Sequence, residues 1–180
     1  MTDELAWETI DSAIDYTCPG FDVRRDDVRL PDGTETDFHT LIDDESVVIL
    51  PFTPDDDLII IEEWRQSVRR LNRGLPAGGV EDDDDDLEAA AHRELAEETG
   101  YIADRVDHLT TVEPANGVTN AVFHYFVAHD CMENGTQDLD HNESIRVELT
   151  TFEALREQVL DGTIRDGRTA LGVLYYTLTA

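Results

Sequence analysis

One segment, from Gly79 to Tyr101, constrains this chain more than any other part of its sequence. It opens with a glycine, continues through a run of acidic residues, and ends in a stretch with helical spacing closed by a second glycine. Residues three and four apart lie on one face of a helix, so Glu94, Glu97 and Glu98 are expected to converge there. Such close like charges repel, and hard divalent cations prefer carboxylate oxygens while keeping waters for substrate phosphates. The segment therefore predicts a metal site for a phosphate ester or anhydride.

The alternative interpretation of these carboxylates is an ordinary solvated helix face. The chain has 42 acidic residues among 180, so clustered carboxylates are expected on any exposed helix. Surface acidity does not explain the remaining frame, in which Gly79, Leu95 and Gly100 stand at fixed distances from Arg93. A pattern of this length and order is more specific than a short glycine motif, and it favours the metal site.

The same residues resemble the Nudix box, the signature of the Nudix hydrolases. That pattern runs Gly, five residues, Glu, seven residues, Arg-Glu, an aliphatic residue, any residue, Glu-Glu, any residue, Gly and an aliphatic residue. The matching positions are Gly79, Arg93, Glu94, Leu95, Glu97, Glu98 and Gly100. Asp85 stands where the first glutamate belongs, and Tyr101 occupies the final aliphatic position. A second register starts at Gly78, counts one more residue in the aspartate run, and leaves the second half of the box unchanged.

Further residues are similar to the ADP-ribose pyrophosphatase branch of that family. They include Leu30-Pro-Asp-Gly33 in an N-terminal β segment and Leu75-Pro-Ala-Gly78 leading into the box. The resemblance implies an α/β/α sandwich with a mixed sheet in residues 46–180, preceded by a small β segment in residues 1–45. In that branch the N-terminal segment helps to form a homodimer and the substrate pocket. This chain carries Gly74 where the branch usually has a glutamate.

Hydrophobic patterning by itself predicts mixed α and β structure. Short runs rich in β-branched residues and bounded by turn residues indicate strands, and apolar residues at helical spacing indicate helices. The expected strands span residues 21–30, 37–42, 46–51, 57–64, 106–112, 121–128 and 145–149. The expected helices span residues 86–98, 152–160 and 169–178, and residues 7–16 are compatible with either state.

The box resemblance implies a set of metal ligands. Glu94 and Glu98, one helical turn apart, are expected to bind Mg²⁺ or Mn²⁺. Glu97 is expected to be a further ligand or a water contact. A backbone carbonyl near Ala77 or Gly78 is expected to complete the coordination sphere.

Catalytic roles fall to the box arginine and to a late polar loop. Arg93 is expected to hold the glutamates in place, either through an ion pair with Glu97 or by reaching Asp85. In the ADP-ribose branch the general base lies on the late loop, and the candidates there are Asp140, His141 and Glu143. Glu143 matches best by position, and the alternative is that all three are ordinary polar loop residues.

Substrate contacts are expected on either side of the metal ligands. Arg65 and Arg69 belong to a basic stretch before the box and could grip phosphates through their forked donors. Surface ion pairs with the abundant aspartates are the alternative for both arginines. Backbone groups of Ala77 and Gly79 are further candidates for substrate binding.

Composition limits the partners and the setting. The net charge is −29 and each of the 13 basic residues is an arginine, so nucleic acid and anionic membranes would be repelled. This charge indicates a salt-loving source. Two cysteines form no disulfide framework, and the N-terminus shows no signal-peptide pattern, so a cytoplasmic location is expected. The apolar runs are too short to span a bilayer.

The leading functional hypothesis is metal-dependent hydrolysis of ADP-ribose to AMP and ribose 5-phosphate. A first alternative keeps this chemistry and changes the substrate to another nucleoside diphosphate sugar or a dinucleotide. A second is a Nudix-fold module that senses a nucleotide without turning it over. The third is an acidic domain with no phosphate role. The complete set of Arg93, Glu94, Glu97 and Glu98 favours catalysis.

Overall fold

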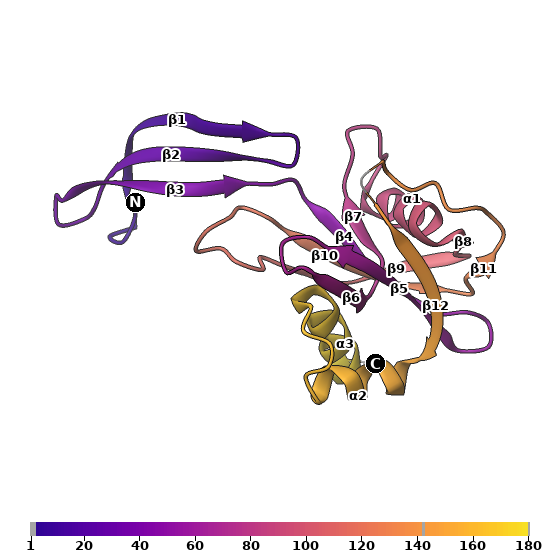
Figure 1. The fold of residues 1–180 in the computed structure, drawn as a ribbon. Coiled ribbons are helices and arrows are strands. Elements are labelled where there is room, and N and C mark those ends of the chain that lie inside the picture. Colours follow the sequence, from indigo (N-terminus) through magenta and orange to yellow (C-terminus); the bar gives the residue numbers. More distant parts are fainter. Residues whose placement is uncertain (1–2, 142, 180) are drawn as a thin grey trace. The chain divides into compact units, whose positions relative to one another are not determined.

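The computed structural model of the protein describes residues 3–141 and 143–179, and the chain divides into two compact units (Figure 1). The first unit holds the chain up to Glu45 together with Glu113–Val122. The second unit holds Ser46–Val112 and the chain from Phe123 onward. The expected role of the N-terminal segment in a dimer and a substrate pocket stays a prediction.

The first unit is built on a three-stranded antiparallel sheet. Its strands β1 (Glu8–Cys18), β2 (Phe21–Arg29) and β3 (Glu35–Ile42) lie in the order β1-β2-β3. The ambiguous residues 7–16 are strand from Glu8 onward, because they pair with β2 over its whole length. Gly33, with a φ of 88°, allows the tight turn between β2 and β3.

The second unit carries the box, and its elements agree with the mixed α and β prediction. Its strands are β4 (Ser46–Pro51), β5 (Asp57–Arg65), β6 (Arg70–Gly74), β7 (Ala77–Gly79), β8 (Tyr101–Ile102), β9 (Arg105–Val112), β10 (Phe123–His129), β11 (Met132–Glu133) and β12 (Ile145–Thr151). Its helices are α1 (Leu87–Thr99), α2 (Phe152–Leu160) and α3 (Gly167–Thr179). One sheet has the order β7-β4-β10-β9 and another the order β12-β5-β6. Since β4 and β10 run parallel while β9 and β7 pair antiparallel, the first of these sheets is mixed.

Alternate residues of the central strands supply two separate cores. In β4, Val47 and Ile49 pack in a cluster with Leu95 of α1. Val48 and Leu50 point the other way, into a cluster that includes residues of α2 and α3. Because both faces are buried, β4 reads as a continuous apolar run rather than an alternating one. In Figure 1, α1 lies on the opposite side of the strands from α2 and α3, which confirms the expected sandwich.

The sequence pattern did not indicate the shortest strands, β6, β7, β8 and β11. They have few apolar residues of their own, and each is held by pairing with a partner strand: β6 with β5, β7 with β4, and β8 with β11. The pairing of β7 with β4 matters for function, because it fixes the Ala77–Gly79 backbone. No helix in the described part of the chain is both long and apolar enough to cross a membrane.

Candidate functional site

Helix α1 presents the box glutamates because its two ends are fixed by its own sequence. The carboxylate of Asp86 accepts a hydrogen bond from the Ala89 N–H at 2.8 Å, which caps the N-terminus. Gly100 adopts a left-handed conformation, with φ of 74°, and its N–H donates to the Ala96 carbonyl at 2.8 Å. With both ends set, Glu94 and Glu98 fall on the buried side of the helix.

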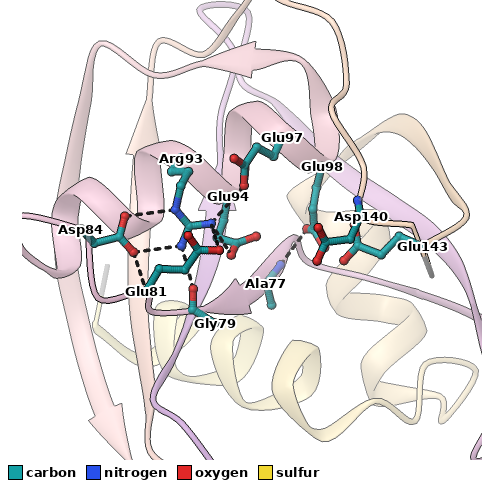
Figure 2. Close-up of polar contacts among 10 residues, drawn as sticks. All are labelled: Ala77, Gly79, Glu81, Asp84, Arg93, Glu94, Glu97, Glu98, Asp140 and Glu143. Atoms are coloured by element: carbon teal, nitrogen blue, oxygen red, sulfur yellow. Dashed lines mark hydrogen bonds and ion pairs between the residues drawn. The ribbon is translucent and has the colours of Figure 1, made fainter. Parts of the chain in front are cut away.

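Glu98 is a buried carboxylate with no ion pair to any cationic side chain that the structure describes. It is only 3% exposed, and one of its oxygens accepts a hydrogen bond from the Ala77 N–H at 2.9 Å (Figure 2). Within residues 3–141 and 143–179, no arginine or histidine forms an ion pair with it. Burial raises the pKa of Glu98 to about 8, and the charges of Glu94 and Glu143 act in the same direction.

Glu94 lies against the backbone of β7 at Gly78, where an added side chain would force the carboxylate to move. A Cβ atom added to Gly78 would come within 2.1 Å of the carboxyl carbon of Glu94. Burial raises the pKa of Glu94 to about 7, although Arg93 opposes the shift with an Nη1 hydrogen bond of 2.8 Å. The absence of a side chain at Gly78 therefore provides the space that the Glu94 carboxylate occupies.

Arg93 joins the acidic loop to the helix. Its Nε and Nη2 atoms donate to the two carboxylate oxygens of Asp84 at 3.0 and 2.9 Å. Its Nη1 atom donates to Glu97 at 3.0 Å, and its Nη2 atom also donates to the Gly79 carbonyl at 2.7 Å. The hydrogen bonds that Arg93 donates to Asp84 make the largest contribution to raising the pKa of Arg93 above its ordinary value, so the guanidinium stays charged.

These contacts correct one expectation about the loop. Arg93 was expected either to pair with Glu97 or to reach Asp85 in the loop. Asp85 is exposed, and the bidentate partner in the loop is Asp84, whose side chain is 5% exposed. The expected pairing of Arg93 with Glu97 is present. The geometry therefore agrees with the second register of the box, which begins at Gly78.

The donor set fits a divalent cation, although its oxygens are not drawn together around one point. In the described residues no three Asp, Glu, His or Cys side chains are grouped closely enough to hold a metal ion. The reason is that Arg93 draws Glu94 and Glu97 to itself, while Glu98 faces Ala77. Two buried carboxylates lie one turn apart, and Glu98 has no ion pair among the described side chains, so a hard cation would nevertheless stabilise this arrangement. The metal roles of Glu94, Glu97, Glu98 and the Gly78 carbonyl stay predictions.

The late loop brings one of its candidate bases to this cluster. The negative charge of Glu143 contributes to the raised pKa values of Glu98 and Glu94, after the larger effect of burial. The Asp140 N–H donates to the Glu143 carboxylate at 3.1 Å, which holds that side chain in the loop (Figure 2). His141 is exposed. Glu143 is thus the loop residue that faces the box glutamates.

The predicted substrate contacts are placed less uniformly. Arg65 is partly buried and pairs with Glu63 at 2.8 Å, close enough to the site for the charge of Glu98 to affect its pKa. Arg69 is exposed, at a positive φ of 51° in the turn before β6. The Ala77 N–H and the Gly79 carbonyl already bond to Glu98 and Arg93, so these two groups are engaged within the protein.

Glu63 is a residue of this region that the sequence pattern did not single out. It is 8% exposed in β5, and burial raises its pKa, with the charge of Arg65 opposing and that of Glu143 reinforcing the shift. The available signal was an acidic residue in the same strand as the apolar run of residues 58–61, close to the candidate Arg65, because buried acidic side chains are usually paired.

Relatives of known sequence and structure resemble the chain over most of its length. It is 28% identical over 158 residues to the ADP-ribose pyrophosphatase of Bacillus subtilis (strain 168), covering 87% of this chain and 85% of that protein. It is also 28% identical over 155 residues to the methanol dehydrogenase activator of Bacillus methanolicus, covering 85% and 83%. The crystal structure of an ADP compounds hydrolase superposes with a TM-score of 0.85, over 96% of this chain and 92% of that one, at 20% identity. This last likeness concerns the fold alone.

A match to a family model shows the family. Residues 43–169 fit the family model described as the NUDIX domain. That range covers well over half of the chain and includes β4, the box and α1. The chain therefore belongs to the Nudix family.

Proposed function

We propose that this protein hydrolyses a nucleoside diphosphate linked to another moiety, with ADP-ribose as the substrate and AMP and ribose 5-phosphate as the products. The observation that carries the proposal is the pair of buried glutamates, Glu94 and Glu98, on adjacent turns of α1. Both have raised pKa values, and the protein gives Glu98 no counter-cation in the part of the chain that the structure describes. A cation and the phosphates it carries would complete this site.

Diphosphate hydrolysis needs neutralised phosphate charge, an activated water and in-line positioning. Glu94, Glu97 and Glu98 would hold Mg²⁺ or Mn²⁺, which supplies the charge neutralisation when bound. Arg93 fixes the positions of Glu94 and Glu97 through its hydrogen bonds. Glu143, which faces the cluster from the late loop, accepts the proton of the attacking water.

The choice of ADP-ribose rests on relatives and on the N-terminal unit. A relative named ADP-ribose pyrophosphatase matches 87% of this chain at 28% identity, and the chain has the N-terminal β segment that the ADP-ribose branch is expected to have. The presence of Glu94, Glu97 and Glu98 in the second half of the box supports turnover over nucleotide sensing alone.

A specific observation keeps a second substrate class in view. A Cβ atom at Gly74 would come within 2.2 Å of the Thr169 hydroxyl, which itself accepts a hydrogen bond from the Leu75 N–H at 3.1 Å. The space that a glutamate would occupy is therefore filled by α3. Because the site lacks this carboxylate, its substrate could differ from that of the ADP-ribose branch, and another nucleoside diphosphate sugar or a dinucleotide is the second candidate.

A substrate panel tests the proposal directly. The purified protein is incubated with Mg²⁺ at high salt and offered ADP-ribose, several nucleoside diphosphate sugars and dinucleotides, and the products are separated by chromatography. We expect AMP and ribose 5-phosphate from ADP-ribose at the highest kcat/KM. Faster cleavage of another member would move the substrate to that class, and no cleavage of any member would leave a nucleotide-sensing module.

The role of Glu143 has a test of its own. Glu143→Gln keeps the size of the side chain and its acceptor oxygen for the Asp140 N–H, but it cannot take up a proton. We expect a large fall in kcat and the loss of the acidic limb of the pH–rate profile. An unchanged rate and profile would remove the late loop from the chemistry.

A further inference from the structure

A polar cavity in the Nudix unit, apart from the box glutamates, is lined by several arginines. Its volume is about 390 Å³, and it lies between the turn joining β5 to β6 and the start of α3. Four of its lining residues are Arg65, Arg70, Arg165 and Arg168. In a chain with 13 arginines and a net charge of −29, this is a strong local concentration of positive charge.

Nearby acidic residues neutralise only part of the positive charge of these four arginines. Arg65 pairs with Glu63, and Arg168 lies 3.8 Å from Asp166. Arg70 and Arg165 have no carboxylate within 4.0 Å among the residues that the structure describes, although most other arginines of the chain have one. The cavity therefore holds more cationic groups than local acids balance.

Two further features indicate that this cavity would bind an anion. The Nε atom of Arg65 is buried and has no hydrogen-bond partner in the described residues. The pKa of Arg65 is lowered first by burial and then by the charge of Arg168, so the two guanidinium groups lie close enough to repel.

The cavity adjoins the carboxylate cluster through one ion pair. Arg65 forms part of the cavity wall and pairs with Glu63. After the larger effect of burial, the charge of Glu143 on the late loop helps to raise the pKa of Glu63. A molecule whose diphosphate lies over the box glutamates could thus place a neighbouring anionic group among the arginines.

We propose that this arginine cavity is a subsite for a phosphate monoester, which is the chemical class of both products of the proposed hydrolysis. The inference rests on the proposed function for the identity of that monoester. Cleavage of a diphosphate diester replaces one anion of charge about −2 by two monoesters of about −1.5 to −2 each at neutral pH. Guanidinium groups form forked, charge-assisted hydrogen bonds with such oxygens, so the cavity favours the more highly charged product state.

Metal-free binding separates this subsite from the hydrolytic site. Inorganic phosphate, ribose 5-phosphate and AMP are titrated into the whole protein by calorimetry, with EDTA present and chloride fixing the ionic strength. Ribose and adenosine serve as uncharged probes. We expect the three phosphate compounds to bind and the two uncharged probes not to bind. The phosphate compound with the highest affinity identifies the group that the subsite recognises.

Matched arginine variants locate the binding. Arg165→Ala removes an exposed side chain from the cavity wall, and Arg156→Ala removes the same charge from α2, away from the cavity. We expect Arg165→Ala to weaken phosphate binding about tenfold, the effect of one lost charge-assisted hydrogen bond, and Arg156→Ala to change it less than about twofold.

Equal weakening by both variants, or no metal-free binding at all, would overturn the subsite. Either result would leave the proposed hydrolysis standing if the substrate panel shows turnover. Conversely, phosphate binding that depends on Arg165 in a protein without turnover would keep the subsite and remove the hydrolysis.

Discussion

Glu98 differs from an ordinary helical glutamate because it is only 3% exposed and forms no ion pair with the residues that the structure describes. The one described hydrogen bond to its carboxylate comes from the Ala77 N–H, and burial raises its pKa to about 8. A carboxyl group in such a place is costly for the folded state once it ionises. A bound cation would offset this cost, which supports a cation site at Glu98.

Replacing this carboxyl by an amide separates its structural and functional effects. Glu98→Gln keeps an oxygen for the Ala77 N–H but removes the charge. We expect hydrolysis to fall by orders of magnitude, measured as product formation with Mg²⁺. Near wild-type rates would remove the metal assignment.

The same variant has an expected pH signature in the metal-free protein. The folded pKa of Glu98 is about 8, above the unfolded value of about 4.3, so the folded state binds more protons between these pH values. Stability of the wild type should therefore fall as pH rises through this window, while Glu98→Gln lacks this loss. Thermal melts with EDTA should show a small difference between the two at pH about 5 and a growing advantage of the variant towards pH about 9. A constant difference would contradict the assigned environment.

Gly78 is the second residue-scale determinant, because the Glu94 carboxylate occupies the space of a side chain there. Gly78→Ala should displace Glu94 or shift β7, destabilising the fold by about 1–3 kcal/mol and lowering Mg²⁺-dependent turnover. Urea titration and activity assays measure the two effects. Gly117→Ala is the control, since an added Cβ there meets nothing within 4 Å.

At the scale of elements, one arginine connects a loop to a helix. Arg93 on α1 binds Asp84 of the acidic loop through two hydrogen bonds, while it also holds Glu94 and Glu97. The loop conformation and the glutamate positions are therefore coupled. Loss of the loop contact should be felt at the site.

Two adjacent aspartates provide a matched pair for this coupling. Asp84→Asn should destabilise the protein by about 1–3 kcal/mol, since it weakens charged hydrogen bonds to Arg93, and should lower turnover as Arg93 loosens. Asp85→Asn makes the same chemical change at an exposed position and should alter both quantities little. A larger effect of the Asp85 variant would restore the first register of the box.

For the whole molecule, the net charge of −29 dominates. Carboxylates on an acidic surface repel one another, and salt screens them by shortening the Debye length from about 10 Å at 0.1 M to about 3 Å at 1 M. We expect the melting temperature to rise between about 0.1 and about 1 M KCl. Equal melting temperatures at both concentrations would contradict a salt-loving protein.

The N-terminal unit carries exposed apolar side chains along its first strand. Ile10, Ile14 and Tyr16 are each about half exposed, which is unusual for such large side chains in a stable sheet. We propose that a second copy of the chain covers them. Sedimentation velocity should show a homodimer for the wild type and a monomer for Ile14→Asp, and a monomeric wild type would rule this out.

The sequence by itself determined the features that depend on neighbours along the chain. The helix over the box follows from the spacing of its residues and from Asp86 and Gly100 at its ends. The buried central strands follow from unbroken apolar runs such as Ser46–Pro51. These signals are local, because a cap or a periodicity acts over one or two turns of backbone.

Only the tertiary structure decided which groups meet across long distances in the sequence. It selected Asp84 over Asp85 as the partner of Arg93, brought Glu143 to the box glutamates, and gathered arginines from two distant segments around one cavity. Every aspartate in an acidic run looks alike in sequence, and loop residues carry no periodicity. Their roles are set by chain closure and burial, which fix distances that residue spacing does not contain.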